Sequence, residues 1–165
     1  MILYHGSIVS VLEPQIIITE AGRDFGPGFY TTSIKQQAER WARRKAKIQK
    51  RLLHEAQAIV SIYEFDETNY DVLRVLHFPE PSIDWLDMVC HCRSDNSFKH
   101  GYDIVTGKIA NDTVGETVSY VVQGIMRKED ALEKLKFENI NDQICFFTNK
   151  ALQHLTYTGF RKIAL

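Results

Sequence analysis

Leu3-Tyr4-His5-Gly6-Ser7 stands at the start of this chain, directly after Ile2. The aliphatic and aromatic side chains of residues 2–4 are typical of a strand. Gly6 follows the histidine and leaves the backbone unobstructed, so that another group can approach it closely. We therefore expect a first strand over Ile2–His5 that ends in a histidine and an accessible backbone.

The elements expected further along alternate between strands and helices. A Gly/Pro-rich turn, Arg23-Asp24-Phe25-Gly26-Pro27-Gly28, leads into Phe29-Tyr30-Thr31-Thr32. Helical periodicity runs from Ser33, a candidate N-cap, to about Gln57. The remaining patterns predict strands at Gln15–Thr19, Ala58–Phe65, Val72–Phe78, Tyr102–Val105, Gln143–Phe147 and Phe160–Ala164, helices after Pro79-Glu80-Pro81-Ser82 and at Glu129–Lys136 and Lys150–Leu155, and either type at Thr113–Gln123.

These elements lack the regular βαβ rhythm and the G-x-G-x-x-G turn of dinucleotide-binding parallel sheets, so we expect an α+β fold. The 165 residues contain no linker, repeat or low-complexity tract, and we expect a single domain over residues 1–165. Hydrophobic residues make up 44% and charged residues 25%, which is ordinary globular composition.

The composition also narrows the class of partner and the compartment. The net charge of −1 gives no reason to expect the chain as a whole to bind polyanions. Three cysteines are an odd and sparse set, unlike a disulfide scaffold, and indicate reduced thiols in the cytoplasm. The N-terminus does not resemble a signal peptide, and no apolar stretch approaches the roughly 20 residues that span a bilayer.

Three separated segments carry the candidate chemistry: Leu3-Tyr4-His5-Gly6-Ser7, Gly28-Phe29-Tyr30-Thr31-Thr32 and Asn141-Asp142-Gln143-Ile144-Cys145-Phe146. Taken singly, a histidine that ends a strand is more often structural than functional. Together and in this order, the segments resemble the H-Y-E signature of the diphtheria-toxin and poly(ADP-ribose) polymerase branch of the ADP-ribosyltransferases. Gln143 stands at the position of the glutamate.

A fourth match concerns Trp41, which lies eleven residues after Tyr30. In that branch a second aromatic residue at this spacing clasps the nicotinamide together with the motif tyrosine. Eleven residues are about three helical turns, so both rings can reach one flat ligand. A core tryptophan on an amphipathic helix remains the alternative.

The resemblance implies a split antiparallel β-sandwich with flanking helices and a role for each site residue. His5 would hydrogen-bond the adenosine ribose, and the Gly6 backbone, with Ser7 beside it, would meet the nicotinamide carboxamide. Tyr30 and Trp41 would stack on the nicotinamide ring. Gln143 would contact the nicotinamide ribose. Apart from the resemblance, Arg23 just before the turn is a candidate to pair with a pyrophosphate, although an exposed loop arginine is the default interpretation. The catalytic candidates are thus Gln143, His5 and Tyr30.

Two departures from the branch bear on catalysis. Gln143 brings no negative charge to a cationic transition state, a loss that typically costs roughly 10²–10³ in rate. Ala38 stands where the polymerases carry a serine that bonds the carboxamide. NAD binding tolerates both changes better than catalysis does.

A more extensive resemblance is to a bacterial family of uncharacterised domains in the same fold group, which has no settled activity. It rests on Leu3–Ser7, on the stretch from Asp24 to Thr32, and on Tyr102-Asp103-Ile104-Val105-x-Gly107-x-x-Ala110-Asn111-Asp112. Asn111 is retained from this stretch as a candidate cofactor-binding residue, although an Asn-Asp pair is ordinarily a turn or a helix cap.

Two further features have mainly structural explanations. Basic residues crowd the predicted helix; a solvated face is the favoured interpretation, and a landing surface for phosphates of NAD or nucleic acid is the alternative. These residues are Arg40, Arg43, Arg44, Lys45, Lys47, Lys50 and Arg51. Cys90-His91-Cys92 lacks the second ligand pair of a zinc site, and we expect no metal.

The sequence therefore predicts an NAD-dependent mono-ADP-ribosyltransferase in the cytoplasm. Its partners would be NAD, a macromolecular acceptor (protein or nucleic acid) and, as an open alternative, an inhibitory protein, with no membrane association. An NAD glycohydrolase and a catalytically silent NAD- or ADP-ribose-binding or interaction module are the competing hypotheses.

Overall fold

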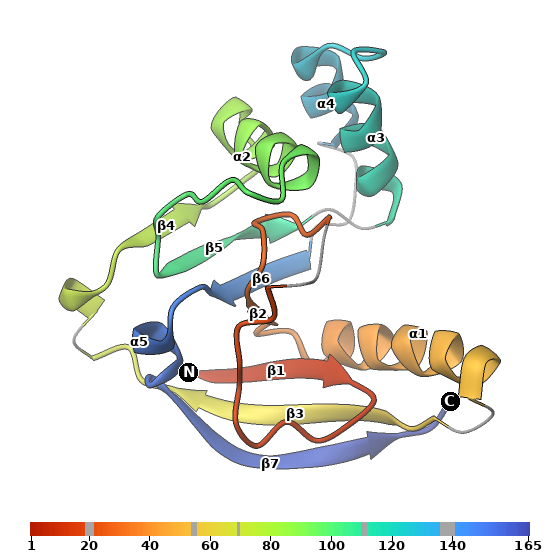
Figure 1. Cartoon of the computed structure of the whole chain (residues 1–165), viewed down its shortest axis with the longest axis vertical. Coiled ribbons are helices and arrows are strands. Elements are labelled where there is room, and N and C mark those ends of the chain that lie inside the picture. The colour runs from red at the N-terminus through yellow and green to blue at the C-terminus, as the bar shows by residue number, and fades with distance from the viewer. Residues whose placement is uncertain (19–21, 54–55, 69, 110–111, 136–140) are drawn as a thin grey trace.

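The computed structural model describes residues 1–18, 22–53, 56–68, 70–109, 112–135 and 141–165. Two sheets form its centre (Figure 1). The first is antiparallel, with the order β1-β3-β7, and contains β1 (Ile2–Ser7), β3 (Ala58–Phe65) and β7 (Leu155–Ile163). The second has the order β2-β6-β5-β4 and contains β2 (Phe29–Thr31), β6 (Asn141–Phe146), β5 (Ile104–Ile109) and β4 (Val75–Phe78).

A single long helix, α1 (Lys35–Leu53), packs along β1 and β3 of the first sheet. Its buried side is a row of alanines at four-residue spacing, Ala38, Ala42 and Ala46, which packs against Ala58 and Val60 of β3. The small side chains let the helix come close to β1. At Gly6 an added Cβ would lie 2.2 Å from the Ala38 carbonyl oxygen. Glycine is therefore required at this position by the packing of the helix on the strand.

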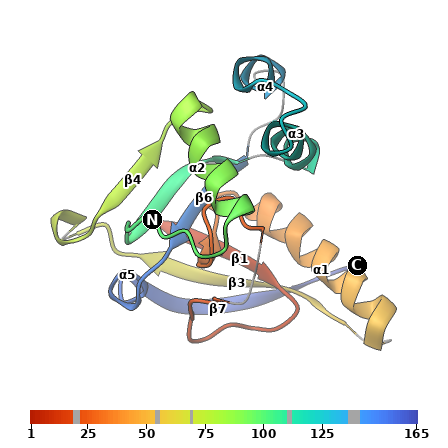
Figure 2. The ribbon, with the colours of Figure 1, turned by 45° about the horizontal axis from the view of Figure 1, so that its top comes forward.

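Three more helices cover the second sheet at the far end from β7 (Figures 1 and 2). They are α2 (Ile83–Ser94), α3 (Asp112–Val122) and α4 (Lys128–Leu135). Ser82 caps α2 by accepting a hydrogen bond from the Trp85 N–H at 3.1 Å. Trp85 and Leu86 are then buried against strands β5 and β6 through Val105 and Cys145. The short elements η1 (Tyr70–Val72) and α5 (Asn149–Leu152) complete the fold.

The expected α+β class is confirmed, but one strand departs from the antiparallel pattern. β4 runs parallel to β5, because α2 lies between them in the chain and carries the chain back to the same end of the sheet. The second sheet is therefore mixed. The segment Thr113–Gln123, left open between helix and strand, is helical up to Val122, where α3 ends.

The strand expected at Gln15–Thr19 is wrong for its described part, Gln15–Ile18, which is a loop; Thr19 lies outside the described residues. Side chains of the first sheet hold the start of this loop. The Ser61 hydroxyl accepts from the Val11 N–H at 3.0 Å, and the Tyr63 hydroxyl donates to the Val11 carbonyl at 2.5 Å. Ile17 and Ile18 are exposed, so an apolar run that suggested a buried strand is in fact surface.

Three other boundaries shift. β7 begins at Leu155 rather than Phe160, which limits the preceding helix to Asn149–Leu152. β4 starts only at Val75, after the 3-10 turn η1. Helix α1 begins at Lys35, and it is the Thr32 hydroxyl that accepts from a backbone N–H just before the helix, that of Ile34, at 3.0 Å, while the Ser33 hydroxyl donates to Asp142 of β6.

Candidate functional site

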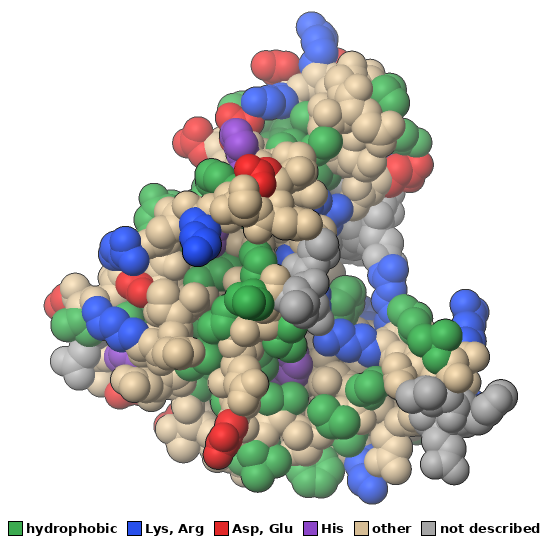
Figure 3. All heavy atoms as spheres, viewed as in Figure 1, with side chains coloured by type: hydrophobic (Ala, Val, Ile, Leu, Met, Phe, Trp, Pro, Cys, Tyr) green, Lys and Arg blue, Asp and Glu red, His purple; other side chains and the backbone are tan. Residues whose placement is uncertain are grey.

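An isolated β-bridge between Tyr4 of β1 and Thr32, next to β2, joins the two sheets, which also share a hydrophobic core. The Tyr4 N–H donates to the Thr32 carbonyl at 2.9 Å, and the Thr32 N–H donates to the Tyr4 carbonyl at 3.0 Å. Beside this junction a cleft of about 1090 Å³ is lined by β1, β2, α1 and the loop after β1. Figure 3 shows a hollow here with basic side chains on its walls. Its volume is that of a site for a large small-molecule ligand.

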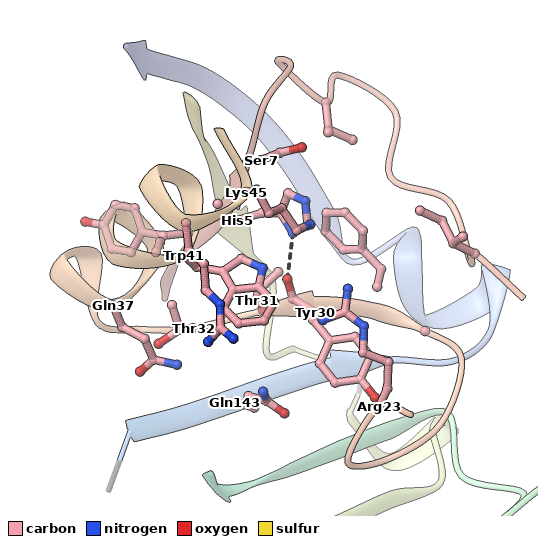
Figure 4. Close-up of a pocket in the computed structure, with 18 of the residues that line it drawn as sticks. His5, Ser7, Arg23, Tyr30, Thr31, Thr32, Gln37, Trp41, Lys45 and Gln143 are labelled. Atoms are coloured by element: carbon pink, nitrogen blue, oxygen red, sulfur yellow. Dashed lines mark hydrogen bonds between the residues drawn. The ribbon is translucent and has the colours of Figure 1, made fainter. Parts of the chain in front are cut away.

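His5 is fixed at the floor of this cleft by two contacts. Its Nδ1 lies 2.7 Å from the Tyr30 carbonyl oxygen (Figure 4), and its ring stacks on Phe29 with centroids 4.5 Å apart and planes inclined by 25°. A carbonyl oxygen only accepts, so the Nδ1 of His5 must carry the proton. The hydrogen bond thus sets both the tautomer and the orientation of the imidazole ring.

Gly6 faces the cleft through its backbone. Backbone groups of successive residues in an antiparallel strand alternate between the two edges of the strand. The N–H and carbonyl of Tyr4 bond to Thr32, on the edge of β1 away from β3. Gly6 lies two residues further along, so its N–H and carbonyl point to that same edge, past the bridge. Ser7, buried at 8% exposure, also lines the cleft.

Tyr30 presents a ring to the cleft rather than an acid or a base. Its hydroxyl donates to the Gly26 carbonyl at 2.5 Å and accepts from the Phe25 N–H at 3.2 Å, which anchors it in the glycine-rich turn. Burial raises the pKa of Tyr30 well above its ordinary value. The phenol therefore stays protonated, and Tyr30 acts through its aromatic face.

Trp41 and Arg23 complete an aromatic slot with Tyr30. Trp41 projects from α1 and keeps 40% of its surface exposed, so it is not a core tryptophan. The guanidinium carbon of Arg23 lies 5.1 Å from the Tyr30 ring centroid and 5.5 Å from that of Trp41 (Figure 4). One planar cation thus contacts both rings at distances typical of cation–π interactions.

Gln143 rises from β6 on the face that carries Tyr30. Tyr30 pairs directly with Cys145, and Gln143 stands two residues before Cys145, so the three side chains share one face of the sheet. The Cys145 thiol donates to Oε1 of Gln143 at 3.5 Å. Burial raises the pKa of Cys145 well above its usual value, so it remains a thiol.

Asp142 ties the start of β6 to the start of α1. Its carboxylate accepts from the Ser33 N–H at 3.0 Å and from the hydroxyls of Thr32 and Ser33. Its backbone carbonyl accepts from the Gln37 amide at 2.8 Å, and its N–H donates to the other end of that amide at 3.2 Å. This network fixes Gln143 relative to α1, and therefore relative to Trp41.

An ion pair closes the inner end of the cleft. Asp24, 6% exposed, accepts from Nε of Arg93 at 2.8 Å, and both residues line the cleft. Burial raises the pKa of Asp24, while the adjacent Arg93 opposes this shift. The pair joins the glycine-rich turn to α2 and holds Arg23, the preceding residue, at the slot.

Three cations of α1 also belong to the cleft wall: Arg40, Arg44 and Lys45. Arg44 and Lys45 lie over the Trp41 ring at 5.7 and 5.9 Å. Arg40 donates to the Asn141 side chain at 2.9 Å. Arg40 and Arg44 are exposed, as expected for a solvated face, and together with Lys45 they also line the cleft.

The family model described as "Protein of unknown function (DUF3990)" matches residues 1–157. The chain belongs to this family. Neither the curated proteins nor the solved structures contain a significant match. The family description assigns no activity, so the function must be argued from the site itself.

The structure brings His5, Gly6, Ser7, Arg23, Tyr30, Trp41 and Gln143 to one cleft. Asn111 lies outside the described residues. Sequence reasoning missed Asp142, Gln37 and the Asp24–Arg93 pair. The position of Asp142 beside Gln143 was a usable signal, whereas nothing local in the sequence links Asp24 to Arg93.

The part of the chain that the structure describes holds neither a metal-ligand cluster nor a membrane-spanning helix. Within the described ranges, no three His, Cys, Asp or Glu side chains are placed to share a metal ion. Cys90, Cys92 and Cys145 are free thiols. Among the helices that the structure describes, none is long and apolar enough to cross a membrane.

Proposed function

We propose that this chain is an NAD-dependent ADP-ribosyltransferase built on the split β-sandwich of that superfamily. The observation that carries the proposal is the convergence of three distant segments on one cleft. His5, Tyr30 and Gln143 come from β1, β2 and β6, and all three line it. Their order and spacing resemble the H-Y-E signature, and the sheets separate beside the Tyr4–Thr32 bridge to leave room for a dinucleotide.

The slot between Tyr30 and Trp41 suits the nicotinamide ring. It already accommodates a flat, positively charged group, the Arg23 guanidinium, and the nicotinamide ring of NAD is also flat and positively charged. The backbone edge of Gly6 offers a donor and an acceptor, which together complement a carboxamide. Tyr30 and Gly6 thus favour a nicotinamide-bearing ligand over a plain nucleotide.

Cations beside the slot suit the pyrophosphate. Arg23, Arg44 and Lys45 all lie within 6 Å of the Trp41 ring. Arginine binds phosphate oxygens through paired N–H donors, and these side chains are long enough to leave the ring for a ligand. His5, with its orientation fixed from the Tyr30 carbonyl, is placed at the cleft floor to hydrogen-bond a ribose hydroxyl.

In such a transfer the bond between nicotinamide and ribose breaks, nicotinamide leaves with the bonding electrons, and an acceptor nucleophile bonds to the anomeric carbon. The chain's contribution is orientation rather than strong base catalysis. Gln143 can position the ribose but supplies no negative charge. We therefore expect a slow enzyme.

The test is nicotinamide release at saturating NAD by wild type, Gln143→Ala and Gln143→Glu, with and without a cell lysate as acceptor source. Gln143→Ala should abolish turnover yet leave NAD affinity within about tenfold, roughly 1.4 kcal/mol. An alanine variant as fast as wild type would remove Gln143 from the mechanism and the transferase proposal with it.

A catalytically silent NAD-binding module is the second candidate, favoured by the missing carboxylate and by the Arg23 guanidinium in the slot. It predicts saturable NAD binding without nicotinamide release in any of the three proteins. Release that does not depend on a lysate would instead indicate an NAD glycohydrolase.

A further inference from the structure

The exposed surface of α1 carries two parallel stripes of side chains that begin at the cleft, with Arg40, Trp41, Arg44 and Ile48, and extend beyond the proposed NAD site. Residues three and four apart share one side of a helix. The cationic stripe consists of Arg40, Arg44, Lys47 and Arg51, and the apolar stripe of Trp41, Ile48 and Leu52. The three apolar residues are 40%, 52% and 70% exposed, which is unusual for large side chains so close together.

No acidic residue interrupts the cationic stripe. The only acid of α1 is Glu39, which lies on another side of the helix, within 3.8 Å of Lys35 and Arg43. Arg43 also turns away and donates to the Ala164 carbonyl at 2.9 Å. The chain has a net charge of −1, so this local row of cations is a marked departure from the rest of the molecule.

We propose that single-stranded nucleic acid binds along this side of α1. Phosphates would follow the cationic stripe, and bases would lie on the apolar stripe, with Trp41 as the aromatic platform at its inner end. A basic row beside an aromatic side chain on which a base can stack is how proteins hold single strands with little regard to sequence. Arg44, which already lies over Trp41, is placed to contact a phosphate that flanks a stacked base.

The position of the stripes favours a strand over other polyanions. Arg40, Trp41, Arg44 and Ile48 line a cleft whose other walls include Gln143 and the loop that contains Val9 and Ile17. A flat membrane surface cannot enter such a concave site, and a duplex keeps its bases stacked away from Trp41. An acidic peptide would satisfy the cations but brings no bases to the apolar stripe.

Binding in itself does not depend on the transferase proposal. If that proposal also holds, NAD occupies Trp41 and Arg44, and the acceptor strand is held by the rest of the two stripes, which lead away from the slot. This assignment of the acceptor class, unlike the binding, rests on the proposed function.

The test is fluorescence anisotropy with labelled oligo(dT) and oligo(U), without NAD, over a range of salt concentrations. Four phosphate contacts predict a slope of log K against log salt of about −2.8, and the double variant Arg44→Ala/Arg51→Ala should reduce it to about −1.4. The matched control Arg43→Ala/Lys50→Ala removes two charges from adjacent positions off the stripe. It should keep the wild-type slope, with affinity changed by less than about twofold.

Several results would overturn the proposal. The first two are no oligonucleotide binding at low salt and an equal loss of affinity in both double variants. The other two are binding of duplex DNA as tight as that of the single strand, and binding of poly-aspartate as tight as that of oligo(dT). The last would point to an acidic protein partner. Binding to phosphatidylserine vesicles that requires Ile48 and Leu52 would also overturn it. Nicotinamide release is measured separately, so strand binding without turnover supports the binding surface while rejecting the transferase.

Discussion

Replacing Arg23 with alanine should open the aromatic slot and strengthen the binding of nicotinamide. The Arg23 guanidinium lies 5.1 Å from the Tyr30 ring and 5.5 Å from the Trp41 ring, so a ligand ring must displace it before it can contact both. Free nicotinamide carries no phosphate, and it offers the displaced guanidinium nothing in return. The variant removes this competition.

The magnitude follows from the two ring contacts. A cation–π contact at a partly exposed site contributes about 0.5–1 kcal/mol, so two contacts amount to about 1–2 kcal/mol. The affinity for nicotinamide should therefore rise by about 5- to 30-fold at most. NAD should gain less, or bind more weakly, because in the wild type Arg23 can exchange the rings for the pyrophosphate.

Calorimetric titration with nicotinamide and with NAD measures both effects. Arg44→Ala is the matched control, since it removes a cation that lies 5.7 Å from the Trp41 ring; its nicotinamide affinity should change by less than about twofold. Quenching of tryptophan fluorescence by acrylamide supplies a readout without ligand. Trp85 is 1% exposed, so any change in quenching between wild type and Arg23→Ala should come from Trp41. If Arg23→Ala keeps the wild-type melting temperature but binds nicotinamide no more tightly than wild type, then Arg23 does not compete for the slot.

Three further variants test the supports of the site. His5→Ala loses the 2.7 Å bond and the stack on Phe29 and should lower the melting temperature by about 3–8 °C while removing stabilisation by NAD; a much larger fall in calorimetry would make His5 a core residue. Gly6→Ala places a Cβ 2.2 Å from the Ala38 carbonyl and should cost about 1–3 kcal/mol in denaturant unfolding, whereas neutral behaviour would contradict the packing of α1 on β1. The third variant concerns Asp103, whose pKa is raised by burial but lowered by its neighbours. It accepts hydrogen bonds from the Arg74 N–H and the Thr148 hydroxyl, and the Arg74 charge lies nearby. Together these neighbours hold the pKa of Asp103 below its ordinary value. A carboxyl whose pKa is lower in the folded state stabilises the fold at pH values above its unfolded pKa. Asp103→Asn should therefore be less stable than wild type at neutral pH, and this difference in the free energy of unfolding should shrink as the pH falls below about 4. A difference in unfolding free energy that does not change with pH would refute this.

Much of the site was predictable because its residues lie in short local patterns. Tyr30 and Trp41 are joined by a turn and a helix of regular pitch, so their spacing in the sequence translates into proximity. His5 and Gln143 were placed only through the family resemblance, because β1 and β6 lie in different sheets and nothing local links them.

What could not be predicted depends on long-range contacts. The Ile16-Ile17-Ile18 run has strand composition, yet it forms a loop because the hydroxyls of Ser61 and Tyr63 on β3 hold the preceding chain at Val11. The sequence likewise did not predict which side of α1 lines the cleft. Helical periodicity shows which residues share a side, but not that Arg40, Arg44 and Lys45 would border a cleft instead of open solvent.

The contact between Cys145 and Gln143 bears on what a glutamine can do in place of a glutamate. A buried thiol that stays protonated donates, and only the amide oxygen of Gln143 can accept, so Oε1 points to Cys145 and the amide N–H groups are left to serve the cleft. Gln143 therefore offers a donor where a glutamate would offer an acceptor. A ribose hydroxyl bound there must accept through its oxygen, and its own proton must go to another group. This arrangement orients the sugar without stabilising positive charge at the anomeric carbon.

In Gln143→Glu the Cys145 thiol would still have an acceptor, but the ribose hydroxyl would have to donate instead of accept. The variant would also add a negative charge to a cleft that is lined by Arg23. A rise in nicotinamide release in this variant would show that charge limits the native rate. A fall would show that the site is tuned to a donor.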